Sequence, residues 1–247
     1  MSKIRFVTFD AFNTLWKLKE PPGKVYGRIA NSKYGCNVDL ERSAQAFVPS
    51  YKTVSSQYPN FGYRSISGYE FWEKIITSTL NAGGLDKPPS KALINELYDH
   101  FATSAPYKLY QDVVPCLVEL KSSGRVKIGL ISNSDSRTEE VLRSFRIRQY
   151  FDVVVLSGVF GIAKPRTEIF REALKLTDVE AQEAIHIGDD VLDFEGAKAA
   201  GMNGLIINRA IQSSEVTGGT ENTDTNTTIS SLRAVLKLVE QGNGIKI

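Results

Sequence analysis

The chain has 247 residues, of which 42% are hydrophobic and 23% charged, a composition typical of globular proteins that bury a sizeable core. Its 30 basic and 28 acidic residues leave a net charge of +2, so charge gives no indication of a nucleic-acid partner. No apolar run approaches the ~18 residues that a membrane span needs, so we expect no membrane segment. The N-terminal MSKIRF enters a predicted strand at once, so we expect no transit peptide. The well-separated Cys36 and Cys116 favour reduced thiols in the cytoplasm, with the nucleus also open.

The first predicted element is a strand over residues 4–9, in which the apolar run FVTF is typical of a buried strand. Residues 16–108 then have the apolar spacing of amphipathic helices and no strand alternation. Gly35 is typical of a helix end, and Asp39 and Ser90 are typical of helix N-caps. The stretch 16–108 is therefore predicted to be all-helical.

From about residue 109 short apolar strands alternate with helical patterns. The strands are predicted at 126–132, 151–157, 183–189 and 203–208. Continuous apolar strands separated by helices predict a parallel sheet that is covered on both faces. We therefore expect a doubly wound α/β core domain formed by residues 1–15 and 109–247, with residues 16–108 inserted as a helical domain. The polar stretch 211–228 is predicted to be a mobile surface loop before a final amphipathic helix.

Polar side chains follow the predicted strands at their carboxyl ends, where ligands bind in open α/β sheets. In chain order these side chains are Asp10, Ser132, Asn133, Lys164, Asp189, Asp190 and Asp193. Each of them alone has an ordinary explanation as a cap, a turn former or a surface residue. Their joint position at one edge of the sheet is what indicates a functional site.

This set of side chains suits phosphoryl transfer. A carboxylate such as Asp10 can attack phosphorus and form an aspartyl phosphate if a divalent cation offsets the repulsion between the two anions. Mg²⁺ prefers oxygen ligands, which Asp10 and Asp189 can supply. Ser132 and the amide of Asn133 can hold phosphate oxygens, and Lys164 can neutralise charge on both the nucleophile and the phosphate.

These residues, in this order, resemble the four motifs of the haloacid dehalogenase-like hydrolase superfamily. The motifs are FDAFNTL (9–15), GLISNSD (129–135), AKP (163–165) and HIGDDVLDFEGAKAAGM (186–202). The stretch YPNFGY…YEFWEKII more loosely resembles the haloacid dehalogenase-like hydrolase domain-containing protein 3 subgroup. The resemblance covers nearly the whole chain and implies a Rossmannoid core with a cap domain, here residues 16–108, inserted after the first motif.

The resemblance also implies roles for individual residues. Asp10 and Lys164 would be catalytic, and Ser132, Asn133 and Lys164 would bind phosphate. The Mg²⁺ site would be formed by Asp10, Phe12, Asp189 and Asp193, with Asp10, the backbone carbonyl of Phe12 and Asp189 as the ligands. Asp193, with help from Asp190, would position the metal-bound waters and Lys164.

The first motif departs from the family pattern at Phe12. Phosphatases of the family carry there a second aspartate, which protonates the leaving group and then activates water. A phenylalanine cannot transfer a proton, and such help contributes about 10²–10⁴-fold to the rate. One hypothesis is therefore a weak or atypical phosphatase that takes a good leaving group, such as an acyl phosphate, or borrows a proton carrier such as Asp135 or a cap residue.

Two other hypotheses stay open. The first is a catalytically inactive binding or scaffold protein that has kept the fold and, with it, phosphate or Mg²⁺ binding. The second is a metal-independent 2-haloacid dehalogenase, since those relatives carry an aromatic residue at the Phe12 position. This hypothesis is less favoured because those relatives lack the acidic fourth motif, which is intact here. The partners expected are a small phosphorylated substrate or none, and a protein partner stays possible.

A few remaining residues are interpreted more simply. His186 lies inside a predicted buried strand, where a core role or support of a neighbouring site residue is favoured over catalysis. Phe61 and Tyr63, on a loop of the inserted domain, are candidates for the substrate entrance, although core packing explains most aromatic residues there. A cluster of arginines after the second motif is interpreted as a solvated helix face, with contact to an acidic partner as the alternative; it comprises Arg137, Arg143, Arg146 and Arg148.

Overall fold

The computed structural model describes residues 3–210 and 227–241. The chain divides into two compact units. The core unit comprises Met1–Lys17, Leu109–Asn133 and Arg146–Ile247, and the helical unit comprises Leu18–Lys108 and Ser134–Phe145. In the described part of the chain, no helix is both long enough and apolar enough to cross a membrane.

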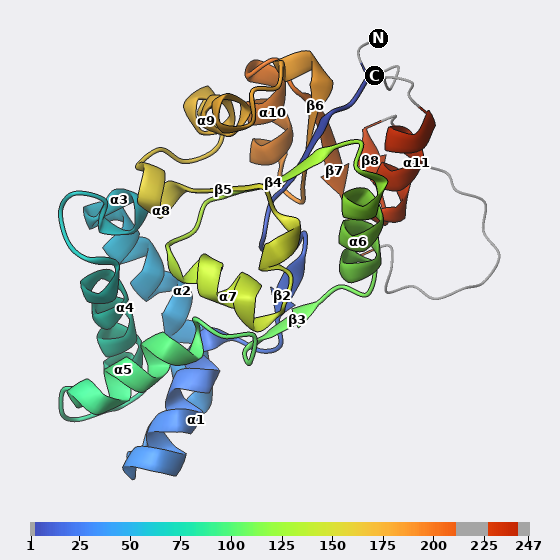
Figure 1. The fold of residues 1–247 in the computed structure, drawn as a ribbon. Helices are drawn as coiled ribbons and strands as arrows, with labels where there is room; N and C mark the ends of the chain where they lie inside the picture. Colours follow the sequence, from blue (N-terminus) through green and yellow to red (C-terminus); the bar gives the residue numbers. More distant parts are fainter. Residues whose placement is uncertain (1–2, 211–226, 242–247) are drawn as a thin grey trace. The chain divides into compact units, whose positions relative to one another are not determined.

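The core unit is built on a six-stranded parallel sheet with the strand order β5-β4-β1-β6-β7-β8 (Figure 1). Its strands are β1 (Phe6–Phe9), β4 (Lys127–Ser132), β5 (Val153–Leu156), β6 (Ala184–Gly188), β7 (Asn203–Ile207) and β8 (Thr228–Ile229). The central β1 and β6 are buried at every position, which is why their sequences are mostly apolar without alternation, with Thr8 and His186 as polar exceptions. In the register of the sheet, Thr8 of β1 lies beside His186 of β6.

Helices pack on both faces of this sheet. They are α6 (Val113–Ser123), α8 (Ser157–Phe160), α9 (Thr167–Thr177), α10 (Val191–Ala199) and α11 (Arg233–Gln241). Helices α9 and α10 pack against each other and against strands of the sheet, and α11 packs against α6 (Figure 1). Phe6 and Ile131 belong to the apolar cluster under α9, together with Phe170 of that helix. The predicted doubly wound α/β fold is confirmed.

The helical unit has its own apolar core. Its helices are α1 (Pro22–Tyr34), α2 (Leu40–Gln57), α3 (Pro59–Gly62), α4 (Gly68–Ala82), α5 (Lys91–His100) and α7 (Arg137–Ser144). The predicted helix ends are confirmed: Gly35 closes α1 at φ 62°, Asp39 accepts hydrogen bonds from two backbone amides of α2, and Ser90 accepts one from α5.

Three short strands differ from the predictions. Residues 16–108 were expected to contain no strand, but β2 (Trp16–Leu18) and β3 (Tyr107–Leu109) form a two-stranded sheet at the two ends of that stretch. Elements of three residues are too short to display alternation in the sequence. Thr228, expected in the surface loop 211–228, belongs to β8 and pairs with Ile206 of β7. Residues 211–226 of that expected loop lie outside the described residues.

The segment 134–145 is grouped with the helical unit, although the sequence analysis assigned it to the core domain. The reason is a set of contacts made by Asp135 and Arg137. The Trp72 indole Nε1–H donates to Asp135 Oδ2 at 2.6 Å. The Arg137 guanidinium lies 4.2 Å from the ring centroid of Trp72 and 4.8 Å from that of Tyr98. The predicted domain boundaries at residues 15 and 108 stay a prediction. The observed units differ from them in the segment 134–145, which belongs to the helical unit.

Candidate functional site

Asp10 follows the last residue of β1 at the carboxyl edge of the core sheet. Its backbone N–H donates to the Ile187 carbonyl at 2.8 Å, which extends the pairing of β1 with β6 by one residue. Asn13, at φ 54°, then turns the chain away from the sheet. A pocket of about 230 Å³ opens at this edge and is lined by Asp10, Phe12, Asn13, Ser132, Asn133, Lys164, Asp189, Asp190, Leu192 and Asp193. The structure thus brings together all the strand-end residues that the sequence analysis selected.

Lys164 is buried at this pocket and makes three hydrogen bonds through its ammonium group. Nζ donates to Asp10 Oδ1 at 2.6 Å, to the Ile131 carbonyl at 3.0 Å, and to Asp193 Oδ1. Burial alone would lower the pKa of Lys164, but Asp10 and Asp193 raise it above its ordinary value. Because an ammonium group has three donors, all three are used by the protein. Lys164 therefore acts in this arrangement as a fixed positive charge beside Asp10.

Asn133 holds the backbone of Lys164 in place. Its side-chain Oδ1 accepts from the Lys164 N–H at 2.8 Å, and its Nδ2 donates to the Lys164 carbonyl at 3.0 Å. The side-chain amide that was considered for phosphate binding is thus engaged with the chain itself. Ser132, at the end of β4, is buried and lines the pocket.

Asp193 lies in the first turn of α10 and is held on both carboxylate oxygens. Asp190 is the N-cap of this helix, and its backbone N–H donates to Asp193 Oδ2 at 3.2 Å as part of a capping box. Oδ1 accepts from Lys164 and lies 3.1 Å from Nε2 of His186. Burial alone would raise the pKa of Asp193, but the hydrogen bond with His186 and the charge of Lys164 hold it well below its ordinary value. Asp193 is therefore ionised.

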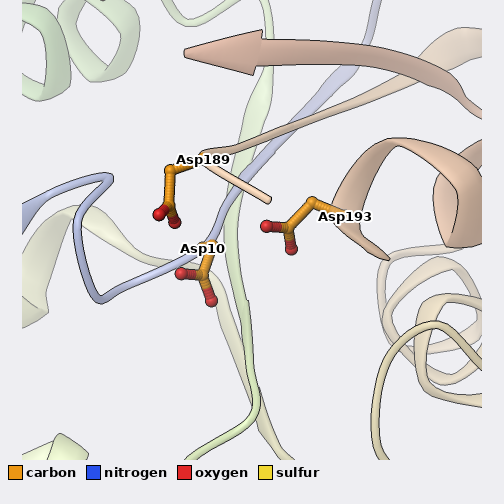
Figure 2. Close-up of side chains that lie close together, drawn as sticks. All are labelled: Asp10, Asp189 and Asp193. Atoms are coloured by element: carbon orange, nitrogen blue, oxygen red, sulfur yellow. The ribbon is translucent and has the colours of Figure 1, made fainter. Parts of the chain in front are cut away.

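Asp189 completes a group of three carboxylates. One carboxylate oxygen from each of Asp10, Asp189 and Asp193 lies within 4.8 Å of the others, and Figure 2 shows the three side chains close together. Burial, followed by the negative charge of Asp10, raises the pKa of Asp189 to about 6. Such a shift arises because burial disfavours the charged form of a carboxylate, and a neighbouring anion adds to this effect. Hard oxygen donors in this arrangement fit a divalent cation of the Mg²⁺ type.

Phe12 also lines the pocket, and its side chain is 40% exposed. A large apolar side chain with this exposure contributes no donor or acceptor to the site. Its backbone carbonyl, which needs no particular side chain, is the atom that the sequence analysis assigned to the metal.

Three other candidates lie in the helical unit. Phe61 and Tyr63 belong to α3 and its C-terminal end, where Phe61 packs against Phe71 at 5.3 Å between ring centroids. The Asp135 carboxylate is bound by Arg137 at 2.9 Å. Burial alone would raise the pKa of Asp135, but the Arg137 charge and hydrogen bonds lower it overall, so Asp135 has no proton to give at neutral pH.

One of the arginines expected on a solvated helix face, Arg137, differs from that expectation. Arg137 is buried against Asp135, Trp72 and Tyr98, so that interpretation is wrong for Arg137. Arg143 is exposed and pairs with Glu139 and Glu140 of the same helix, as expected for a solvated face. The difference arises because α7 packs the side that carries Arg137 onto aromatic residues that are distant in the sequence.

Comparisons with known proteins agree with this description. A profile described as haloacid dehalogenase-like hydrolase matches residues 4–201. The haloacid dehalogenase-like hydrolase domain-containing protein 3 of Mus musculus is 31% identical over 208 residues, which are 83% of this chain and 82% of that protein. A 2-haloacid dehalogenase from Pseudomonas syringae has a similar fold, with a TM-score of 0.69 at 21% identity, covering 97% of this chain and 100% of that one. A phosphatase from Thermococcus onnurineus has a TM-score of 0.62 at 22% identity, covering 96% and 98%.

Proposed function

Because the chain belongs to the haloacid dehalogenase-like hydrolase family, we propose that it is a Mg²⁺-dependent phosphatase-type hydrolase with Asp10 as its nucleophile and with weak or atypical activity. The observation that carries the proposal is the ion pair between Lys164 Nζ and Asp10 Oδ1 at 2.6 Å, inside a cluster of three carboxylates. A buried cation on one oxygen of Asp10 fixes the carboxylate in orientation. Among residues 3–210 and 227–241, no donor is hydrogen-bonded to its other oxygen, Oδ2, which is the atom we assign to the attack.

In the first step Asp10 Oδ2 forms a bond to phosphorus while the bond from phosphorus to the leaving oxygen breaks, and the leaving group takes the electron pair. In the second step water attacks the phosphorus of the aspartyl phosphate and releases inorganic phosphate and the Asp10 carboxylate. Lys164 balances the charge of Asp10 throughout. Ser132 and Asn133 are among the residues that line the pocket, and the Ser132 hydroxyl and the Asn133 backbone N–H are the groups that we assign to the phosphate oxygens.

Asp10 and Asp189, with the backbone carbonyl of Phe12, are the groups proposed to hold Mg²⁺. When bound there, Mg²⁺ would offset the repulsion between the carboxylates and the phosphate and stabilise the charge that develops in the transition state. Both carboxylate oxygens of Asp193 accept hydrogen bonds from protein donors. We therefore assign Asp193 first to the positioning of Lys164, and only second to direct metal binding.

Phe12 narrows the range of substrates. With no proton carrier at this position, a leaving group must depart as a stable anion, which is true of a carboxylate from an acyl phosphate or a phenolate from an aryl phosphate. Asp135 does not replace the missing acid, because its carboxylate is already committed to Arg137 and has a lowered pKa. The substrate class proposed is therefore small acyl or aryl phosphates, with alkyl phosphates turned over poorly.

Phe12 also supports a second candidate, a family member that binds phosphate or Mg²⁺ without turnover. The dehalogenase hypothesis has weaker support. The likeness to 2-haloacid dehalogenases is a likeness of fold, and the carboxylates of Asp189 and Asp193 have no evident use in metal-independent attack on carbon.

The test is hydrolysis of acetyl phosphate and 4-nitrophenyl phosphate with Mg²⁺ and with EDTA, using the Asp10→Asn variant as the control for contaminating phosphatases. Turnover that requires Mg²⁺ and is lost in Asp10→Asn supports the proposal. Turnover that persists in Asp10→Asn contradicts it. Absence of turnover with retained Mg²⁺ binding favours the second candidate, and EDTA-insensitive halide release from 2-chloropropionate favours the dehalogenase.

A further inference from the structure

His186 connects the interior of the sheet to the candidate site. Its side chain, fully buried in β6, lies beside Thr8 of β1 in the register of the sheet. Ring atom Nδ1 is 2.9 Å from Thr8 Oγ1, and Nε2 is 3.1 Å from Asp193 Oδ1. The Phe170 ring packs edge-on against the imidazole with 5.2 Å between centroids. His186 is not among the residues that line the pocket, so it reaches the site only through Asp193.

The hydrogen positions on the imidazole follow from its neighbours. The ionised Asp193 carboxylate is acceptor-only, so a ring nitrogen at hydrogen-bond distance from it must carry a hydrogen. The Thr8 hydroxyl has one hydrogen, which goes either to Nδ1 or to the Ile185 carbonyl at 3.1 Å. If the Thr8 hydroxyl donates to Nδ1, the ring is neutral and its hydrogen is on Nε2. If the hydroxyl donates to the Ile185 carbonyl, both ring nitrogens carry a hydrogen. Nε2 is therefore protonated in either charge state of the ring.

The Asp193 carboxylate has no freedom to rotate in this setting. It is bonded on Oδ2 by the Asp190 amide, and on Oδ1 by His186 and Lys164. The carboxylate also packs directly on the backbone of Gly188, where an added Cβ would lie 2.1 Å from Asp193 Cγ. The side-chain rotamer of Asp193 then decides where the Lys164 ammonium sits, because Asp193 is one of its three acceptors.

We propose that His186 is a positioning residue: its Nε2–H, in a ring oriented by Thr8, fixes the Asp193 carboxylate so that Asp193 holds the Lys164 ammonium against Asp10. The functional part of this inference rests on the proposed function, in which Lys164 balances the charge of Asp10. The hydrogen-bond part does not, because it concerns the resting protein alone.

The first experiment reads the hydrogen position directly. The chain has two histidines, so ¹⁵N-histidine labelling gives two sets of ring signals, and the His100→Gln variant leaves those of His186 alone. We expect Nε2 of His186 to be protonated throughout the pH range in which the protein is folded. A ring with hydrogen on Nδ1 only would overturn the proposal, whatever the activity of the protein.

The second experiment separates positioning from packing with two variants of similar polarity. A glutamine amide nitrogen at position 186 reaches the place of Nε2, whereas an asparagine amide nitrogen reaches only the place of Nδ1. With acetyl phosphate and Mg²⁺, we expect His186→Gln to keep kcat within about threefold, and His186→Asn to lower kcat at least about tenfold with KM nearly unchanged. Equal kcat in the two variants contradicts the proposal. His100→Gln, in the helical unit, serves as the matched control with unchanged kcat.

Failure of the proposed function can be told apart from failure of this inference. If the unmodified protein has no turnover, the inference is tested by the ring signals and by Lys164 itself, through the ¹⁵N shift of its Nζ. We expect the Lys164 shift to be the same in His186→Gln as in the unmodified protein and displaced in His186→Asn. If His186→Asn does not fold, the ¹⁵N ring signals of His186 in the unmodified protein still test the proposal, because they show which ring nitrogen carries the hydrogen.

Discussion

Asn133 and Lys164 hold each other through two hydrogen bonds, from the Lys164 N–H to Asn133 Oδ1 at 2.8 Å and from Asn133 Nδ2 to the Lys164 carbonyl at 3.0 Å. Asn133 follows β4, and Lys164 lies in the connection between α8 and α9. One side chain thus ties the loop that carries the lysine to the end of the neighbouring strand. The placement of the Lys164 ammonium beside Asp10 depends on this connection.

Replacing Asn133 by alanine removes both hydrogen bonds and leaves two part-buried backbone groups of Lys164 unpaired. We expect the free energy of unfolding to fall by about 1–3 kcal/mol and kcat to fall about tenfold or more, because Lys164 Nζ is displaced from Asp10. Urea unfolding and acetyl phosphate hydrolysis measure the two effects. Asn203→Ala is the matched control, since its side chain donates to the Ala184 carbonyl at 3.0 Å away from the pocket. Equal losses of kcat in both variants would contradict this role of Asn133.

Replacing Phe12 by aspartate supplies the missing proton carrier at the pocket. We expect hydrolysis of an alkyl phosphate such as glycerol phosphate to increase by about 10²–10⁴-fold, while the rate at which acetyl phosphate phosphorylates Asp10 changes much less, because its leaving group needs no proton. Phe12→Asn, which removes the ring but cannot transfer a proton, is the control. A similar gain in Phe12→Asn would mean that the bulk of the ring, and not the lack of an acid, limits the natural protein.

Mg²⁺ affinity should depend on pH through Asp189. Burial and the charge of Asp10 raise the pKa of Asp189 to about 6, so in the metal-free protein this carboxylate is protonated below that pH. Because a proton and a cation compete for the same group, affinity is present above pH 6 and lost as the pH falls. From pH 7 to pH 5 we expect Kd for Mg²⁺ to rise about tenfold. Isothermal titration calorimetry in matched buffers checks this, and an equal Kd at both pH values would contradict it.

The pair formed by Asp135 and Arg137 should stabilise the helical unit rather than take part in proton transfer. Asp135→Asn leaves the Arg137 guanidinium buried without its anion, and we expect the free energy of unfolding to fall by about 3–5 kcal/mol. The pKa of Asp135 is lowered by folding. The stability that the ionised Asp135 contributes is therefore fully present above its pKa in the unfolded chain, and it is lost as the pH falls through its pKa in the folded protein. Urea unfolding at pH 7 and pH 3 measures both effects, with the exposed Asp99→Asn as the control. A loss below about 1 kcal/mol would contradict this assignment.

The site could be predicted in outline because its residues are tied to strand ends. Asp10, Lys164 and Asp189 each follow a recognisable apolar run, and parallel strands bring their carboxyl ends to one edge. The hydrogen bond between His186 and Thr8 could not be predicted in the same way. His186 contacts Thr8 only because β6 pairs with β1 in one particular register, and a sequence does not state which strands are neighbours.

Other features depend on contacts between distant residues. The strand β8 has two residues and exists through pairing with β7, so no pattern in residues 228–229 could indicate it. The grouping of residues 134–145 with the helical unit follows from Trp72 and Tyr98, which flank Arg137. The sequence around Arg137 does not indicate that these two aromatic side chains pack against it. Arg137 was therefore expected on a solvated helix face.

The most direct test of the account is whether Asp10 itself becomes phosphorylated. The protein is mixed with acetyl phosphate and Mg²⁺, quenched in acid within seconds, digested, and examined by mass spectrometry. We expect a phosphoryl group on the peptide that contains Asp10, absent in EDTA and absent in the Asp10→Asn variant. Hydrolysis of acetyl phosphate without this modification, or a modification that persists in EDTA, would contradict it.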